Sequence, residues 1–142
     1  PAVSARAGGS SATAQSQGDM MVGVLVDACG WAALMDAGLN LDDAMKGVVG
    51  QADMMVLECV HRELNLLSQQ RKGLLLNLLE RRSERVSDIE GVAHTDEMLV
   101  TLSGLRGWPV LTVDRGLKEQ LISSGGSYIE VTSGRFLRLI EA

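Results

Sequence analysis

The stretch PVLTVDRGLKEQLISSGG, residues 109–126, sets an apolar run directly before a carboxylate, Asp114, and a helical pattern directly after it. The stretch VGVLVDACGW, residues 22–31, repeats the arrangement with a Val-rich run that ends on Asp27. Short Val-rich runs that alternate with longer segments of helical spacing are typical of a parallel sheet with helices between its strands. We therefore predict an α/β fold in which two strands each end on an acid.

The same alternation continues along the chain. Strands are expected at Val22–Val26, Met54–Leu57, Val110–Val113 and, with a weaker pattern, Ser127–Val131. Helices are expected at Trp31–Met35, Leu41–Val49, Val60–Arg82 with a break near Gly73, Thr95–Leu105 and Arg115–Ser123. Leucines at spacings near three and four form an apolar stripe in the long third segment, at Leu64, Leu67, Leu74, Leu75, Leu78 and Leu79. The stripe indicates a core or a dimer contact, which is the ordinary role of such a pattern.

Length and composition predict one folded domain. The chain has 142 residues, of which 46% are hydrophobic and 22% are charged, as in a cored globular protein. Residues 1–19 are small and polar, so we expect a flexible tail or a vector-derived remnant there, and a single domain over residues 20–142. No apolar run reaches the roughly 18 residues of a membrane span, so we expect no membrane association and a cytoplasmic protein. Cys29 and Cys59 lack the spacing of a metal or disulfide motif and are expected to be reduced thiols.

The net charge of −5 argues against a protein that holds nucleic acid on a broad basic surface. It leaves room for an enzyme whose acids surround divalent cations, because four carboxylates that face two such ions nearly cancel their charge. The acids are therefore the first candidates for a site.

Four acids could share that site. Asp27 and Asp114 each follow a predicted strand, and the carboxyl ends of parallel strands meet at one edge, so both should project into one crevice. Glu63 lies one turn into the helix after the second strand, and Asp96 lies in a first helical turn with Thr95 as its expected N-cap. The four acids could instead have ordinary structural roles, as helix caps, as partners of a helix dipole or as a solvated charge. Together the four acids form an oxygen-only set suited to two ions of Mg²⁺ or Mn²⁺.

Such a site fits phosphodiester hydrolysis. Two hard cations held by carboxylates lower the pKa of water and stabilise both the attacking and the leaving oxygen of an in-line displacement. Arg115 and Lys118, on the helix after Asp114, are then candidates to hold flanking phosphates. Arg115 and Lys118 could equally be an ordinary basic pair on a solvated face of the helix.

These pieces together resemble the PIN domain family of small α/β nucleases. The matching segments are VLVDACGW (24–31), VLECVHREL (56–64), AHTDEML (93–99) and LTVDRGLKEQL (111–121). The resemblance implies a three-layer α/β/α sandwich around a mostly parallel sheet, and a metal-dependent endoribonuclease. It implies four metal-binding acids and one supporting hydroxyl, at Asp27, Glu63, Asp96, Asp114 and Thr112.

The ending ISSGGSYIEVTSGRFLRLIEA, residues 122–142, is similar to that of the PIN nucleases of small-subunit ribosomal RNA processing. The VapC-type toxin nucleases are the second group of the family that the chain resembles. The resemblance implies an RNA substrate, a homodimer as in many members, and a ribosome-biogenesis factor or an antitoxin as a partner. The chain departs from the family at Ala28 and Cys29, where a hydroxyl residue and Asn are common, and at Val113, where Asn or Ser is common. These changes remove hydrogen bonds beside the acids and predict weaker catalysis more than lost metal binding.

Other functions remain open. His61 or His94 could join the acids in a different hydrolase that uses Mn²⁺, Fe²⁺ or Zn²⁺, although a His near a helix start is more often a surface or capping residue. A PIN-like scaffold that binds RNA or a protein in a larger assembly would retain metal without cleaving RNA. A phosphoacceptor receiver is disfavoured because residues 24–30 supply a single acid, and a dinucleotide-binding fold because no GxGxxG follows a strand.

Overall fold

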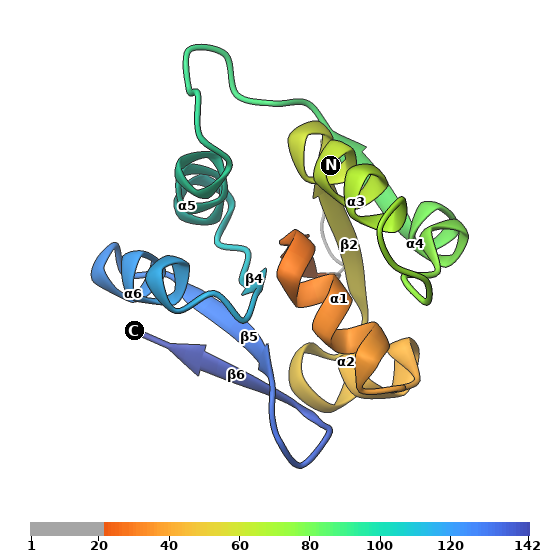
Figure 1. Cartoon of the computed structure of the whole chain (residues 1–142). Helices are drawn as coiled ribbons and strands as arrows, with labels where there is room; N and C mark the ends of the chain where they lie inside the picture. The colour runs from red at the N-terminus through yellow and green to blue at the C-terminus, as the bar shows by residue number, and fades with distance from the viewer. Residues whose placement is uncertain (1–21) are drawn as a thin grey trace.

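A computed structural model describes residues 22–142 as six strands and six helices (Figure 1). The strands are β1 (Val22–Val26), β2 (Ala52–Leu57), β3 (Ser83–Val86), β4 (Val110–Leu111), β5 (Ser127–Val131) and β6 (Leu137–Glu141). The helices are α1 (Ala28–Asp36), α2 (Leu41–Val49), α3 (Glu58–Ser68), α4 (Leu76–Arg82), α5 (Thr95–Arg106) and α6 (Arg115–Ser123). The predicted tail over residues 1–19, and the domain start at residue 20, lie outside the described residues.

The six strands form one sheet in the order β3-β2-β1-β4-β5-β6. Neighbouring strands from β3 to β5 are parallel, and β6 runs antiparallel to β5. The chain moves outward from β1 to β3 and then returns to the other side of β1 at β4. Right-handed crossovers therefore set α1 to α4 on one face and α5 and α6 on the other (Figure 1). The predicted α/β class, a mostly parallel sheet between two helical layers, is confirmed.

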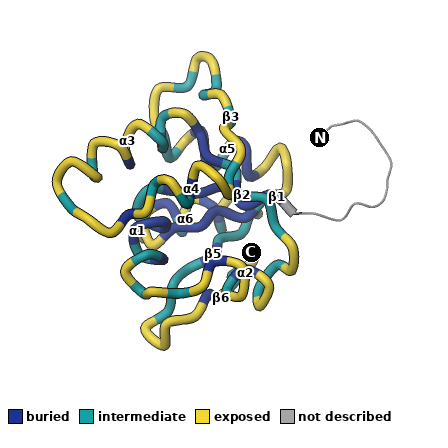
Figure 2. Tube along the Cα trace, turned by 90° about the vertical axis from the view of Figure 1, so that its right-hand side faces the viewer, coloured by how far each residue is buried: buried dark blue, intermediate teal, exposed yellow. Residues whose placement is uncertain are grey.

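The core lies along the central strands, where Figure 2 shows the buried part of the chain in dark blue. Val24, Leu25 and Val26 of β1 are fully buried, because a parallel strand with helices on both faces exposes neither side to water. Trp31 of α1 is also fully buried, and its indole Nε1 donates a hydrogen bond of 2.7 Å to the carbonyl oxygen of Leu74. This bond ties α1 to the connection between α3 and α4.

Several element boundaries differ from the sequence-based expectation. The long third helical segment is two helices, α3 and α4, separated by a connection that contains Gly73 in a left-handed conformation. Helix α1 begins three residues earlier than expected, at Ala28. Strand β4 ends at Leu111 instead of Val113, although the amide of Thr112 still donates to the carbonyl oxygen of Ile129 at 3.0 Å. Two residues, Thr112 and Val113, therefore lie between the end of β4 and Asp114.

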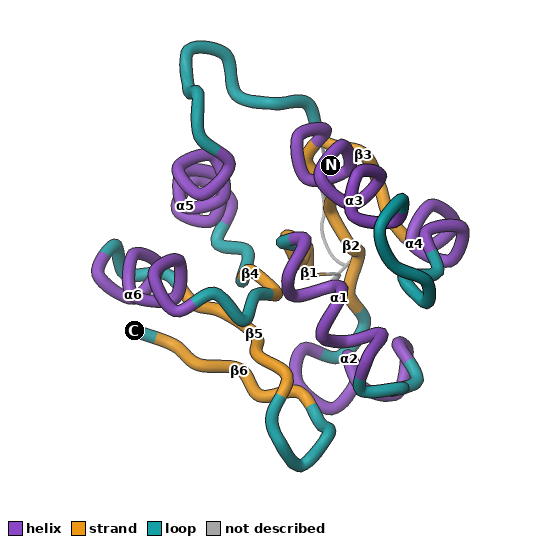
Figure 3. The backbone as a smooth tube through the Cα atoms, viewed as in Figure 1, coloured by secondary structure: helices purple, strands orange, loops and turns teal. Residues whose placement is uncertain are grey.

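Two strands were not expected from the sequence. Strand β3 has the polar sequence SERV and lies at the edge of the sheet (Figure 3), where charged side chains are favoured because they discourage pairing with another chain. Strand β6 follows β5 through a short hairpin loop and forms the opposite edge of the sheet. Within residues 22–142, every helix is too short or too polar to cross a membrane.

The leucine stripe divides between core and surface. Leu64, Leu74 and Leu79 are buried in the core, so the core interpretation of the stripe is confirmed for them. Leu75 is exposed and takes a left-handed conformation with φ of 50° at the start of α4.

Candidate functional site

The structure brings the four predicted acids to one hollow at the carboxyl edge of the sheet. The hollow is open to solvent, has a volume of about 410 Å³, and is lined by Asp27, Ala28, Cys29, Glu63, Asp96, Val113 and Asp114. It lies where the strand order reverses, between β1 and β4, which is the position at which open α/β sheets bind ligands. Helices α1, α3 and α5 supply part of its lining, and Val113 and Asp114 come from the segment directly before α6.

Asp27 is the most enclosed of the four acids, with 7% of its surface exposed. Its Oδ1 accepts a hydrogen bond of 2.9 Å from the amide of Ala28, the first residue of α1. Its Oδ2 accepts one of 2.8 Å from the Thr112 hydroxyl and one of 3.1 Å from the Cys29 thiol. Three donors therefore fix the orientation of this carboxylate toward the hollow.

Thr112 connects the two strand-end acids. It is fully buried, and besides donating to Asp27 its hydroxyl oxygen accepts a hydrogen bond of 3.1 Å from the amide of Asp114. The Asp114 carboxylate in turn caps α6, because its Oδ2 accepts a hydrogen bond of 2.9 Å from the amide of Leu117. Asp27 and Asp114 thus both act as helix caps, and both line the hollow.

Cys29 donates a hydrogen bond that a comparison of the sequence with the PIN pattern does not predict. The pattern predicts a lost hydrogen bond at this position, yet the thiol donates to Asp27 and lies 3.4 Å from the Thr112 hydroxyl. Burial raises the pKa of the Cys29 thiol, and the charge of Asp27 adds to the effect. The thiol therefore stays protonated and able to donate.

Glu63 and Asp96 have raised pKa values. Partial burial is the main cause for both, and the negative charge of Asp27 is the next. Asp96 also feels Asp114, while His94 acts in the opposite direction and lowers the pKa. Glu63 and Asp96 are therefore close enough to Asp27 and to each other for their negative charges to repel, and Asp96 is also close enough to Asp114.

Replacing Glu63 should stabilise the metal-free protein. A raised pKa means that the folded chain holds the proton of Glu63 more tightly than the unfolded chain, so its ionisation at neutral pH costs stability. We expect Glu63→Gln to raise the free energy of unfolding by about 0.5 kcal/mol at pH 7, a small value because the site is open to solvent. The gain should fade as the pH falls through the raised pKa, where Glu63 is itself protonated.

Urea unfolding in EDTA at a series of pH values measures this effect. Glu119→Gln is the matched control, since Glu119 is an exposed glutamate in the middle of α6 and outside the hollow. Equal stability of Glu63→Gln and the parent at pH 7 would show that neither burial nor the neighbouring acids make the ionised Glu63 costly to the fold.

The chemistry of the donor set fits a hard divalent cation, because all four groups are carboxylates. Among residues 22–142, however, no group of three or more Asp, Glu, His or Cys side chains is arranged to hold a single ion. The side chains of Glu63 and Asp96 stand on helix surfaces and can change rotamer, whereas Asp27 is fixed by its three donors. Asp27 would therefore be the fixed ligand of a bound ion, and Glu63 and Asp96 the adjustable ones.

The two histidines differ in their relation to the acids. His94 lines a second open hollow together with Glu63 and Asp96. It also occupies the N-cap position of α5, so the expectation that Thr95 caps this helix is wrong. His61 instead contacts Glu80 through Nε2 and Asn65 through Nδ1, and does not line the acid hollow.

The predicted phosphate-binding residues lie on α6 just beyond the hollow. Arg115 is exposed, directly after Asp114. Lys118 is half-buried, and its Nζ lies 2.7 Å from Oε1 of Glu130, so it is already part of an ion pair. Of the two, only Arg115 is exposed in the way that the sequence-based interpretation assumes.

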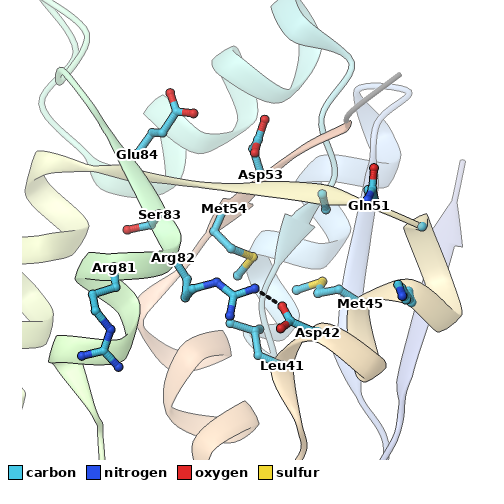
Figure 4. A pocket seen from close by; sticks show the side chains of 13 residues that line it. Leu41, Asp42, Met45, Gln51, Asp53, Met54, Arg81, Arg82, Ser83 and Glu84 are labelled. Carbon is cyan, nitrogen blue, oxygen red and sulfur yellow. Dashed lines mark hydrogen bonds and ion pairs between the residues drawn. The ribbon is translucent and has the colours of Figure 1, made fainter. Parts of the chain in front are cut away.

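A separate cavity lies at the opposite, amino-terminal end of β2 and β3 (Figure 4). It has a volume of about 530 Å³ and a floor of Leu41, Met45 and Met54, and the ion pair between Arg82 and Asp42 spans it. None of the predicted site residues lines this cavity.

Comparison with known proteins identifies the fold. No family model matches the chain, and no curated protein matches its sequence. A solved structure of the PIN domain endonuclease Utp24 is similar to this chain with a TM-score of 0.70 and 17% sequence identity. The match covers 84% of this chain and 92% of that chain. The chain therefore has the PIN-like fold that its sequence predicts.

Proposed function

We propose that this protein is a divalent-metal-dependent endoribonuclease that hydrolyses RNA phosphodiester bonds at the acid hollow. The observation that carries the proposal is the meeting of Asp27, Glu63, Asp96 and Asp114 in one hollow at the point where the strand order of a PIN-like sheet reverses. The similarity to a PIN domain endonuclease supports the same reaction class. Processing of ribosomal RNA is the biological role we favour.

The four acids would hold two ions of Mg²⁺ or Mn²⁺. Such ions, when bound, stabilise the charge that develops on the attacking and leaving oxygens of the phosphodiester. The chain itself orients the acids: Thr112 and Cys29 donate to Asp27, and the amide of Leu117 fixes Asp114. Helices α1 and α6 also begin at the hollow, and the positive ends of their dipoles favour the negative charge of the acids and of phosphate.

The ion requirement is the first test of this function. Purified protein is incubated with end-labelled single-stranded and structured RNA in Mn²⁺, Mg²⁺, Zn²⁺ or EDTA. We expect internal cleavage products in Mn²⁺ and Mg²⁺, and none in EDTA, because carboxylate oxygens bind hard cations. The label at either end distinguishes internal cleavage from trimming.

Each other outcome points to a different function. Cleavage that needs Zn²⁺ would favour a hydrolase in which His94 joins the acids. Binding of Mn²⁺ without cleavage of any RNA would favour a noncatalytic scaffold within a larger assembly. Cleavage that persists in EDTA would contradict the proposed mechanism.

A further inference from the structure

A group of cations extends from the acid hollow across α6 and the C-terminal hairpin. Arg115 is the first residue of α6 and is exposed. Lys118 lies one turn further, with its Nζ 2.7 Å from Oε1 of Glu130 and 5.3 Å from the centroid of the Tyr128 ring. Arg138 of β6 donates from Nε to the other oxygen of Glu130 at 2.9 Å. We call Arg115, Lys118 and Arg138 the cation line.

The strand register sets the direction of the cation line. Leu111 of β4 pairs with Ile129 of β5, so Glu130 lies one residue closer to the edge of the sheet that carries Asp114. Glu130 pairs in turn with Arg138 of β6. Because neighbouring strands are about 4.8 Å apart, β6 lies about 10 Å from β4 along that edge. The cation line thus starts beside the hollow and ends at the edge strand.

One carboxylate holds two of these cations. The side chain of Glu130 is only 12% exposed, whereas that of Arg138 is 59% exposed. Lys118 and Arg138 together carry one more charge than Glu130 neutralises, and Arg115 adds another. An arginine has five N–H donors in a fixed plane, so the donors of Arg138 that do not reach Glu130 remain available to a ligand. Among these four side chains, positive charges exceed negative charges by two, in a chain with a net charge of −5.

We propose that the cation line binds successive phosphates of a single RNA strand beside the bond that is cleaved. This inference rests on the proposed function and names the path of its substrate. Glu130 is the positioning residue: it fixes the spacing of Lys118 and Arg138, so that little side-chain entropy is lost when RNA binds. The path crosses two strand spacings, which limits the contact to a few nucleotides.

Binding to a fluorescently labelled single-stranded RNA, measured by anisotropy in EDTA over a range of NaCl concentrations, tests the path without cleavage. We expect Arg138→Gln to weaken binding about fivefold and to lower the slope of log K against log salt by about 0.7, the contribution of one phosphate contact to a single strand. Arg115→Gln should act alike, and the two losses should combine. Lys46→Gln is the matched control, since Lys46 is an exposed lysine beside the cavity at the opposite end of the sheet.

Equal weakening by Arg138→Gln and Lys46→Gln would overturn the path, because only overall charge would then matter. Failure of the parent to bind RNA, with binding of an acidic protein instead, would also overturn it. If the parent cleaves RNA and Arg138→Gln binds RNA as tightly as the parent does, the proposed path is wrong and the proposed nuclease function stands. Arg138-dependent binding without cleavage in any divalent ion would support the path and contradict the nuclease.

Discussion

Asp27→Asn should give a folded protein that cleaves RNA at least about a thousandfold more slowly. The substitution removes one charge from the acid hollow at nearly constant volume. Loss of one ligand from a two-ion site costs several kcal/mol of transition-state stabilisation, and about 4 kcal/mol corresponds to a thousandfold in rate. The fold should survive, because Asn still offers an oxygen to the amide of Ala28 and the Thr112 hydroxyl can rotate to accept from the new NH₂ group.

Single-turnover cleavage in Mn²⁺ measures the rate, and thermal unfolding checks the fold. Asp114→Asn should behave in the same way, since Asn is as good an N-cap as Asp and can still bind the amide of Leu117. Asp43→Asn is the control, because Asp43 is an exposed acid of α2 that does not line the hollow. Cleavage at the parental rate by both site variants would refute the role of these acids.

Gly30→Ala should be the most destabilising glycine-to-alanine substitution within residues 22–142. Gly30 lies in the first turn of α1, and a Cβ on it would lie 2.6 Å from the carbonyl carbon of Leu111 and even closer to the oxygen. That neighbour is backbone of β4 and cannot rotate away, so the helix or the strand must shift. Overpacking of this kind costs about 3 kcal/mol.

Gly47→Ala is the matched control for this prediction. Gly47 lies in α2, and a Cβ there would have no heavy atom within 4 Å. The same substitution should therefore stabilise the protein by about 0.5 kcal/mol or more, because alanine has the higher helix propensity. Urea unfolding of both variants should give changes of opposite sign. A loss of less than about 1 kcal/mol for Gly30→Ala would mean that α1 and β4 are not in close contact.

The sequence predicted the elements that have a strong apolar pattern. The boundaries of β1, α2 and α6 agree with the expectation, because each buries one clear run or face of apolar side chains. Those of β5 agree too, although its pattern is weaker and Ile129 is its one buried residue. Strand β3 could not be predicted in this way, since SERV has no apolar alternation and is held by pairing with β2 along its length. Tertiary pairing, rather than local preference, decides its structure.

The acids of the candidate site could be predicted from the sequence, but the contacts that support them could not. Two strand-end acids must share the carboxyl edge of a parallel sheet, which is why Asp27 and Asp114 could be paired from sequence alone. The hydrogen bond from Cys29 depends on the rotamer at the start of α1, and the ion pair of Lys118 depends on how α6 lies over β5. Neither is encoded in residue spacing. The catalytic and metal-binding roles of the acids stay predictions.

The shortness of β4 gives the sheet a weak seam. Only two residue pairs join β4 to β1, Leu25 with Val110 and Val26 with Leu111, whereas four pairs join β1 to β2. On one side of this junction are β1 to β3 and α1 to α4, and on the other are β4 to β6, α5 and α6, although α1 also packs against β5 and α2 against β6. Asp27 and Glu63 belong to the first side, and Asp96 and Asp114 to the second. A ligand that engages all four acids would therefore bridge the two sides of this junction, at the place where the pairing between strands is short.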